Sequence, residues 1–404
     1  MRGSKMDLGR LLHRAVAEII TEEELLARLR MGRPLRLKLG FDPTKPDLHL
    51  GHAVALRKLR QFQELGHRVV LIVGDWTAQI GDPSGRDETR SVLSPEEVRA
   101  NAQTYMEQFF KVVDKDRTEV RWQSEWFGKF TLADVYDLTR RFTLADLMEH
   151  ETYDSRFKAG QPITIMELLY PLLQGYDSLA IDADVEFGGT DQKFNILVGR
   201  RLQAMLGKTP QSVFLVPLLT GADGRKMSKS FGNTIDLAEP PEEMYGKVMS
   251  ISDTVLIEYF TSTTDVKEAE IANMQEMMAV GTVNPRDLKM RLAREIVAQF
   301  HGPRAAKTAE GEFTRIFQRR ELPSDMPEFE LTAPVALCTF LVDAGLASSK
   351  SEAKRLTLQG AVEIDGQKVL DPDRLIPILP VVNSVIRVGK RRFCRALLKH
   401  DQAP

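Results

Sequence analysis

The alternation of apolar and polar positions predicts a parallel-sheet unit near the start of the chain. Residues 35–41 alternate between apolar and other residues with the period of a strand. Apolar residues at helical spacing predict a helix over about 50–65, and the continuous apolar run 69–73 is typical of a strand that is buried on both faces. A strand, a helix and a buried strand in this order form a βαβ unit, so we expect an α/β fold.

Helical patterns cover most of the remaining chain, namely residues 9–30, 100–180, 192–206 and 240–320. Shorter strand-like segments interrupt them at 119–122, 185–188 and 213–219. The proline-rich stretch 321–334 has no helical period, so we expect it to contain a linker to a small C-terminal domain in which short helices and strands alternate.

Composition is that of an ordinary folded protein. The 404 residues are 43% hydrophobic and 28% charged, which fits roughly two to four domains. No apolar run is long enough to span a bilayer, and the N-terminus does not resemble a secretory signal. The two cysteines, Cys338 and Cys394, are too few for a disulfide framework or a four-ligand zinc site. We therefore expect a cytoplasmic protein.

Charge is distributed unevenly along the chain. Overall, 55 Lys and Arg face 57 Asp and Glu, but residues 335–404 contain 11 basic and 7 acidic residues, a net charge of +4. A basic C-terminal module indicates a polyanionic partner, although a charge of this size is also common on an ordinary solvated surface.

A His-Leu-Gly-His sequence lies between the first predicted strand and the first predicted helix. Ligands of open α/β sheets bind at this position, and a helix N-terminus attracts anions through its unpaired N–H groups. His49 and His52 share one helical face and can donate to phosphate oxygens, while Gly51 leaves room for a nucleotide base. Two ordinary surface histidines are the alternative, and a metal site is weaker still because no third ligand lies nearby.

A second candidate is the glycine-rich loop 221–230, which follows a predicted strand. Lys226 and Lys229 are three residues apart, so they can wrap a triphosphate and neutralise charge that develops on pyrophosphate. The glycines permit the backbone movement that such a loop needs. A solvated basic loop is the alternative.

Together, these two sequences resemble the two signatures of class I aminoacyl-tRNA synthetases. More of the chain resembles bacterial tyrosyl-tRNA synthetases, namely residues 40–52, 79–86, 168–178 and 186–195. Residues 345–369 resemble the S4 RNA-binding domain that those enzymes carry at the C-terminus. The resemblance implies that ATP activates L-tyrosine to tyrosyl-adenylate with release of pyrophosphate, and that the tyrosyl group then passes to the 3′ end of tRNA(Tyr). It also implies a homodimer formed through a helical insertion around 100–170.

The resemblance further implies how the chain is divided. The expected order is a Rossmann-like catalytic domain with the helical insertion and the KMSKS loop (226–230), an α-helical tRNA-binding domain, a linker and a small α+β S4-like RNA-binding domain. Their expected bounds are 1–235, 236–325, 326–334 and 335–404.

Matching motif positions imply a set of site residues. The catalytic residues, which handle the ATP phosphates and the departing pyrophosphate, are Thr44, His49, His52, Lys226 and Lys229. ATP would also be bound by Asp42, Gly51 and, through its ribose, Asp191. Tyrosine would be bound by Asp82, Tyr170, Gln174, Asp177 and Gln192. Pyrophosphate or the tRNA acceptor end would meet Arg86 and Arg90, and RNA would meet Ser349, Lys350, Lys354 and Arg355. Mg²⁺ would arrive on the phosphates of ATP, so no protein metal site is expected.

The tyrosine contacts agree with helical spacing. Tyr170, Gln174 and Asp177 stand at i, i+4 and i+7 and so share one face of a helix, for which a solvent-facing polar stripe is the alternative. In the family, Asp177 would accept the phenol hydrogen bond with help from Gln192. A tyrosine of the better-known family version also contacts the phenol, and Lys38 stands at that position here, which leaves the second phenol contact open.

Three rival functions follow from the same features. Tryptophanyl-tRNA synthetases share the architecture and rival the tyrosine assignment. A non-catalytic RNA-binding protein built on a synthetase fold is disfavoured, because the phosphate-handling residues are present. An adenylylating enzyme that loads something other than tRNA is disfavoured by the basic, S4-like C-terminus.

Overall fold

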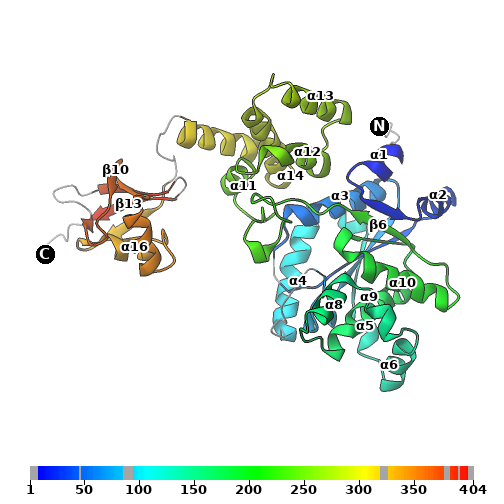
Figure 1. Ribbon diagram of the computed structural model, residues 1–404. Coiled ribbons are helices and arrows are strands. Elements are labelled where there is room, and N and C mark those ends of the chain that lie inside the picture. The colour runs from blue at the N-terminus through cyan, green and yellow to red at the C-terminus, as the bar shows by residue number, and fades with distance from the viewer. Residues whose placement is uncertain are drawn as a thin grey trace. The chain divides into compact units, whose positions relative to one another are not determined.

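The computed structural model describes residues 8–44, 47–84, 94–318, 326–376, 383–389 and 392–398 (Figure 1). The chain folds into two compact units, Met1–Ala306 and Lys307–Pro404. Among the helices of the described ranges, none has the length and apolar character needed to cross a membrane.

A six-stranded sheet forms the centre of the first unit. Its order is β1-β6-β5-β2-β3-β4, with neighbours from β6 to β4 parallel and the short β1 antiparallel to β6. The strands are β1 (Glu18–Ile20), β2 (Arg36–Phe41), β3 (Arg68–Val73), β4 (Thr118–Trp122), β5 (Val185–Gly189) and β6 (Ser212–Val216). The chain order reverses between β2 and β5. The carboxyl ends of these two strands therefore form the switch point at which open α/β sheets bind ligands.

Helices connect these strands in the βαβ manner that the sequence predicts. Helix α3 (Leu50–Glu64) connects β2 to β3, and α10 (Lys193–Met205) connects β5 to β6. Helix α1 (Leu8–His13) precedes β1, and α2 (Glu22–Arg30) joins β1 to β2. The insertion contains α4 (Pro95–Phe109), α5 (Ser124–Phe127), α6 (Leu132–Thr139), α7 (Leu144–Leu147), α8 (Glu151–Lys158) and α9 (Ile165–Ala180). Apolar residues 69–73 of β3 are all buried, as a strand covered on both faces requires.

Four helices follow the sheet in the chain. They are α11 (Pro241–Val248), α12 (Leu256–Thr263), α13 (Glu268–Ala279) and α14 (Pro285–Phe313). Helix α14 is kinked where Gly302 has a φ of 86°, just before Pro303. Both residues interrupt a regular helix, because proline lacks the N–H and glycine permits the left-handed backbone.

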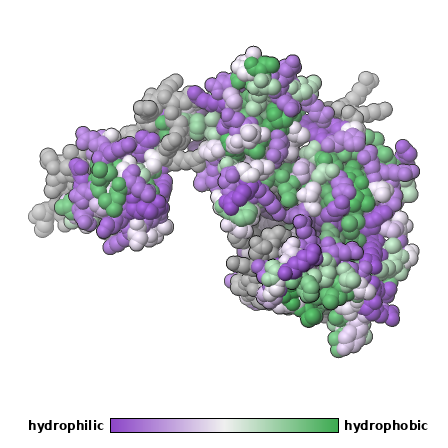
Figure 2. All heavy atoms as spheres, in the orientation of Figure 1, coloured by the Kyte–Doolittle hydropathy of each residue, from purple (hydrophilic) through white to green (hydrophobic). Residues whose placement is uncertain are grey.

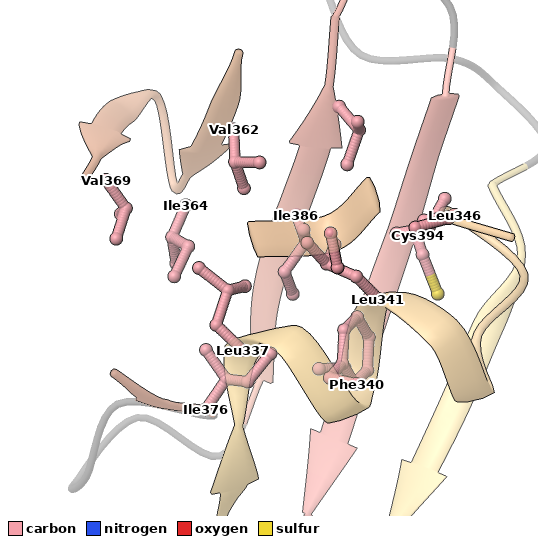
Figure 3. Close-up of a cluster of buried hydrophobic side chains, with 14 of the residues drawn as sticks. Leu337, Phe340, Leu341, Leu346, Val362, Ile364, Val369, Ile376, Ile386 and Cys394 are labelled. Carbon is pink, nitrogen blue, oxygen red and sulfur yellow. The ribbon is translucent and has the colours of Figure 1, made fainter. Parts of the chain in front are cut away.

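The second unit is a small α+β domain. Its five-stranded sheet has the order β10-β9-β12-β13-β7, and β8 (Val335–Ala336) pairs separately with β11 (Leu375–Ile376). The sheet strands are β7 (Glu328–Leu331), β9 (Val362–Ile364), β10 (Gln367–Val369), β12 (Asn383–Val388) and β13 (Arg392–Leu398), and the helices are α15 (Leu337–Asp343) and α16 (Lys350–Leu358). Figure 3 shows Leu337, Phe340 and Leu341 of α15 facing Ile364 and Ile386 of the sheet in one apolar core.

The hairpin expected at Asp365-Gly366 is present. Both residues have positive φ, 49° and 81°, and β9 pairs with β10 directly across them. This is the backbone that a two-residue hairpin turn requires, and Asp-Gly tolerates it better than most pairs.

Two strands differ from the sequence prediction. Strand β1 lies within the segment 9–30, which was expected to be a pair of helices; its Ile19 and Ile20 pair with the edge of β6. Strand β7 lies within the expected linker 326–334 and pairs in parallel with β13. Each strand has only three or four residues and is held by a distant partner, so local periodicity does not indicate it. The division at 306 coincides with neither expected boundary, 235 or 325, and the finer domain division stays a prediction.

Candidate active site

A cleft of about 380 Å³ opens at the carboxyl ends of β2 and β5. The structure brings thirteen of the expected site residues to its wall: Asp42, Thr44, His49, Gly51, His52, Asp82, Tyr170, Gln174, Asp177, Asp191, Gln192, Lys226 and Lys229. Arg86 and Arg90 lie outside the described residues. The cleft thus joins residues that come from five separate parts of the chain.

The N-terminus of α3 forms one wall. His49 is the N-cap residue, and its backbone N–H donates to Nδ1 of His52 at 3.2 Å. The two rings lie 3.9 Å apart. Burial, followed by the charge of Lys229, lowers the pKa of His52 to about 4; burial and the neighbouring His52 lower that of His49 further. Both rings are therefore neutral near pH 7 and can donate hydrogen bonds without adding a buried charge.

Gly51 is required by close packing in the same turn. A Cβ atom at this position would lie 3.0 Å from two atoms of the His49 ring. Any larger residue would press on the histidine, so Gly51 keeps this end of the cleft open.

The loop after β6 brings the two lysines to the same end of the cleft. The N–H of Met227 donates to the carbonyl of Leu219 at 2.8 Å, and the Met227 side chain is buried, which anchors the loop. The ammonium of Lys226 lies 2.5 Å from the carboxylate of Asp191, and that of Lys229 donates to the backbone carbonyl of Asp47. Asp191, expected at the ribose, is thus paired with a lysine expected at the phosphates.

Asp177 lies at the opposite end of the cleft, on α9. Its side chain is only 2% exposed, and its two oxygens accept hydrogen bonds from Gln123 Nε2 at 2.9 Å and from Trp126 Nε1 at 3.1 Å. Burial raises the pKa of Asp177 to about 7, while the charge of Lys38 and these hydrogen bonds oppose the rise. The carboxylate can therefore change its ionisation near neutral pH.

Sequence reasoning missed Gln123 and Trp126. Gln123 is held by the backbone N–H groups of Trp76 and Thr77, which donate to its Oε1, so its amide N–H₂ faces Asp177. The residue follows β4 directly, and the rule that strand ends carry ligands would have pointed to it. The strand signal at 119–122 is weak, however, and nothing local pairs it with a residue 54 positions away.

Two further carboxylates lie along the cleft wall. The hydroxyl of Tyr170 donates to Asp42 at 2.9 Å, and Asp42 also accepts from Thr77 at 2.7 Å. Asp82 accepts from Gln192 Nε2 at 2.7 Å and from the N–H of Ser84 at 2.8 Å, and burial raises the pKa of Asp82. Gln192 and Asp82, both expected to bind tyrosine, are thus in contact with each other. Asp42, expected at ATP, contacts a residue expected at tyrosine.

Lys38 does not reach the cleft. The side chain is completely buried beneath α9, where its ammonium lies 3.0 Å from Glu186 and donates to the carbonyl of Gln174 and the hydroxyl of Ser178. Gln174 Nε2 also donates to Glu186, at 3.3 Å. Lys38 does not line the cleft, whereas Gln123 does.

The residues expected to bind RNA lie together on α16 of the second unit. Ser349 caps the helix by accepting from the N–H of Glu352 at 3.2 Å. Lys350, Lys354 and Arg355 are exposed, whereas Ala353 and Thr357 face the core. The four residues thus share the solvent side of one helix start.

Comparisons with known proteins agree with this architecture. Residues 30–318 match the family model for tRNA synthetases class I (W and Y), and residues 318–396 match that for the tyrosine–tRNA ligase SYY-like C-terminal domain. The tyrosine–tRNA ligase of Dehalococcoides mccartyi (strain 195) is 54% identical over 98% of this chain and all of its own length, and that of Thermotoga maritima is 52% identical over 96% of each.

Solved structures show the same similarity. The tyrosyl-tRNA synthetase of Archaeoglobus fulgidus, solved with L-tyrosine, has a TM-score of 0.61 at 25% identity, covering 75% of this chain and 98% of that one. The C-terminally truncated mitochondrial enzyme of Coccidioides posadasii has a TM-score of 0.60 at 25% identity, covering 75% and 90%.

The parallel sheet, the cleft at its switch point and the match over residues 30–318 define a class I tRNA synthetase of the tryptophan and tyrosine group. Within that group, the C-terminal match and the identity to full-length relatives decide between the two specificities. The chain belongs to the tyrosine–tRNA ligase family.

Proposed function

We propose that this protein activates L-tyrosine with ATP and transfers the tyrosyl group to the 3′ end of tRNA(Tyr). One observation carries the proposal: a single cleft has a cationic end and a buried carboxylate at the other end. The first end combines the N-terminus of α3 with Lys226 and Lys229, and the second presents Asp177. A triphosphate fits the first end and a phenol hydroxyl fits the second.

The chemistry needs no protein nucleophile. A carboxylate oxygen of tyrosine attacks the α-phosphorus of ATP; the bond from that phosphorus to the bridging oxygen breaks, and pyrophosphate leaves with the electron pair. His49 and His52 would donate hydrogen bonds to phosphate oxygens, with Thr44 beside them. Lys226 and Lys229 would stabilise the charge that develops on the leaving group. In the second step the 3′-terminal ribose hydroxyl attacks the tyrosyl carbonyl carbon, and AMP leaves as the hydroxyl proton is released.

ATP binding would rearrange one contact. Lys226 and Asp191 are paired at 2.5 Å, and we assign them to the phosphates and the ribose respectively. Both therefore exchange this ion pair for contacts to the nucleotide, a change that the anchored but glycine-containing loop can accommodate.

Magnesium would enter with the nucleotide. Among the described residues, no group of three or more His, Cys, Asp or Glu could hold a metal ion. Phosphate oxygens and water, which Mg²⁺ prefers in nucleotide enzymes, would therefore supply its ligands. Bound in this way, the ion would neutralise charge on the phosphates.

The second unit would hold the tRNA. The exposed cations of α16 and its N-terminus suit phosphate contacts, with Ser349, Lys350, Lys354 and Arg355 as the contact residues. A cytoplasmic location goes with this role, because tRNA is charged where proteins are made.

We also propose a homodimer that uses the insertion. Large apolar side chains are exposed on α6 to α9, among them Leu132, Tyr136, Leu144, Phe157 and Ile165, each more than 60% exposed. Figure 2 shows apolar side chains gathered on the part of the surface where Figure 1 places α5 and α8. Such a surface is unusual on a monomer. Light scattering should give a dimer mass, and Leu132→Asp with Tyr136→Asp should shift it to the monomer; a monomeric wild type would contradict the proposal.

Amino-acid-dependent ATP–pyrophosphate exchange tests the function directly. We expect strong exchange with tyrosine and negligible exchange with the other nineteen amino acids, phenylalanine and tryptophan included. Charging of tRNA(Tyr) should follow in the same preparation. Preference for tryptophan would overturn the specificity, and exchange without transfer to tRNA would overturn the second step.

A further inference from the structure

A second cavity lies in the first unit, away from the cleft. Its volume is about 390 Å³, and its lining residues come from α1, the C-terminal half of α3, the segment just after α4, the α12–α13 connection and α14. It shares no lining residue with the cleft. Arg60 of its wall follows His52 by eight residues of α3, about 12 Å along the helix axis.

Positive charge dominates the wall of this cavity. Four cationic side chains, those of Arg10, Arg57, Arg60 and Lys111, face two acidic ones, Glu64 and Asp265. Asp265 is shared, at 2.6 Å from Arg57 and 3.9 Å from Arg10. Arg60 and Glu64 form a half-exposed pair at 3.3 Å, and Lys111 has no ion pair among the described residues. At least one cation therefore remains uncompensated.

Two more cations lie buried behind the wall. Lys58 Nζ donates to the carbonyl of Leu11 at 2.8 Å, and Arg14 donates only to backbone carbonyls of 260–266. Burial, with the charges of Arg14, Arg10 and Arg57 next, lowers the pKa of Lys58 to about 7. A buried ammonium among guanidinium groups is costly, and the charge of Glu268 offsets only part of the lowering of its pKa.

Part of this cluster has a structural explanation. Arg14 satisfies carbonyl groups at the C-terminus of α12, where a cation is favoured. That role does not explain Arg60 and Lys111, which line the cavity without contacting these carbonyl groups. Arg10 Nε and Gln61 Oε1 are both buried without a hydrogen-bond partner, a donor and an acceptor respectively.

We propose that this second cavity binds a phosphate group. Arg10 and Arg57 would supply the inner contacts, and Arg60 and Lys111 would close the rim. The phosphate could come from two sources: free phosphate or pyrophosphate in solution, or one backbone phosphate of the tRNA. The site does not depend on the proposed reaction, because none of its residues lines the cleft.

Calorimetric titration of the full chain with inorganic phosphate and with pyrophosphate tests the site. The titration is done in a Lys229→Ala background, which weakens phosphate contacts in the cleft. We expect Arg60→Gln with Lys111→Gln to raise the Kd for phosphate at least about tenfold, as expected for the loss of one or two charge-assisted hydrogen bonds. The matched control is Lys115→Gln, an exposed lysine that does not line the cavity. Absence of phosphate binding, or binding that the rim variants leave unchanged, would overturn a site for free phosphate.

The second arm uses tRNA. If a backbone phosphate of tRNA occupies the cavity, the rim variants should reduce the slope of log K for tRNA binding against log salt concentration by about one to two. Lys115→Gln should leave this slope unchanged. In the wild-type background, Arg60→Gln with Lys111→Gln should leave the rate of tyrosine-dependent exchange unchanged, since both residues lie outside the cleft. Loss of phosphate binding with an unaltered salt slope assigns the cavity to free phosphate. If neither phosphate binding nor the salt slope changes, the proposal is wrong.

Discussion

Asp177 and Lys38 show how single residues set the character of the cleft. The carboxylate of Asp177 faces the cleft, whereas the ammonium of Lys38 lies behind it and pairs with Glu186. Asp177, Glu186 and Lys38 are thus three buried charged side chains, two of them acidic and one basic. Burial penalises the charge of Asp177 and raises its pKa, and the charge of Lys38 opposes this rise.

Substitution of Asp177 tests which amino acid the cleft selects. A buried carboxylate is satisfied by the hydroxyl of tyrosine and left unpaired by phenylalanine. In tyrosyl-tRNA synthetases, kcat/KM for tyrosine exceeds that for phenylalanine by a factor of about 10⁵, and we expect a ratio of this size for the wild-type protein. In Asp177→Ala, the ratio of kcat/KM for tyrosine to that for phenylalanine should collapse. A ratio that survives the mutation would show that Asp177 does not read the hydroxyl.

The same carboxylate predicts a pH dependence. With a pKa raised to about 7, Asp177 becomes protonated as pH falls through neutrality and then loses its role as a charged acceptor. We expect kcat/KM for tyrosine to fall below about pH 7. His52 titrates near pH 4 and does not explain such a limb. Asp177→Asn should remove the pH dependence; if the limb persists, another group causes it.

Lys38 is predicted to stabilise the fold and the charge of Asp177 together. In Lys38→Met, Glu186 is left buried without its cation, and breaking such a pair typically costs about 3–5 kcal/mol. The charge of Lys38 also lowers the pKa of Asp177, so the acidic limb should move to higher pH. Urea unfolding and the pH profile measure the two effects. The control Lys38→Met with Glu186→Gln should recover stability; a single variant as stable as wild type would contradict the argument.

At the scale of elements, the loop between β6 and α11 meets the N-terminus of α3. Met227 anchors the loop to the end of β6, and Lys229 reaches the carbonyl of Asp47 just before α3. A helix N-terminus and two lysines therefore converge on one place, although about 175 residues separate them in the chain. The arrangement suits a leaving group that gains negative charge.

The Lys229→Ala variant tests this arrangement. Loss of one preorganised donor should slow adenylate formation by roughly 10²–10³-fold, while the affinity for tyrosine should change little, since Asp177 lies at the other end of the cleft. Single-turnover kinetics measure the rate of adenylate formation, and equilibrium binding measures the affinity for tyrosine. Arg225→Ala is the control, because Arg225 is exposed in the same loop and does not line the cleft. Normal activation in Lys229→Ala would remove the catalytic role of the loop.

At the scale of the whole molecule, the chain forms two compact units. The cleft and its charged residues belong to the first unit, whereas the second has its own apolar core (Figure 3). Strand β7 pairs with β13, so the second unit begins before residue 335. A truncation that keeps β7 would leave an unpaired strand, which favours aggregation.

Removal of residues 319–404 is therefore the appropriate truncation. ATP–pyrophosphate exchange should stay near normal, since no cleft residue is removed. Charging of tRNA should fall sharply, and the salt slope of tRNA binding should become shallower because phosphate contacts are lost. A truncated enzyme that charges tRNA as well as the full chain would refute an RNA-binding role for the second unit.

Local pattern was sufficient for much of the fold. The strands at 36–41, 68–73 and 185–189 and the helix at 50–64 lie within a few residues of their predicted bounds. Each depends on the burial of its own side chains, which periodicity records directly. The sequence also predicted thirteen residues of the cleft wall, because they belong to motifs at the ends of these elements.

The sequence by itself thus determined the α/β class, the family and the two motifs that meet in the cleft, because these are properties of contiguous segments. Only the tertiary structure decided which residues pair with one another through hydrogen bonds, ion pairs and strand pairing. Gln123 and Trp126 hold Asp177, Lys38 pairs with Glu186 away from the cleft, and β1 and β7 exist because distant strands accept them. A hydrogen bond or ion pair between residues 50 to 200 positions apart leaves no periodic trace in either segment, since its energy arises only once the fold has brought the two together.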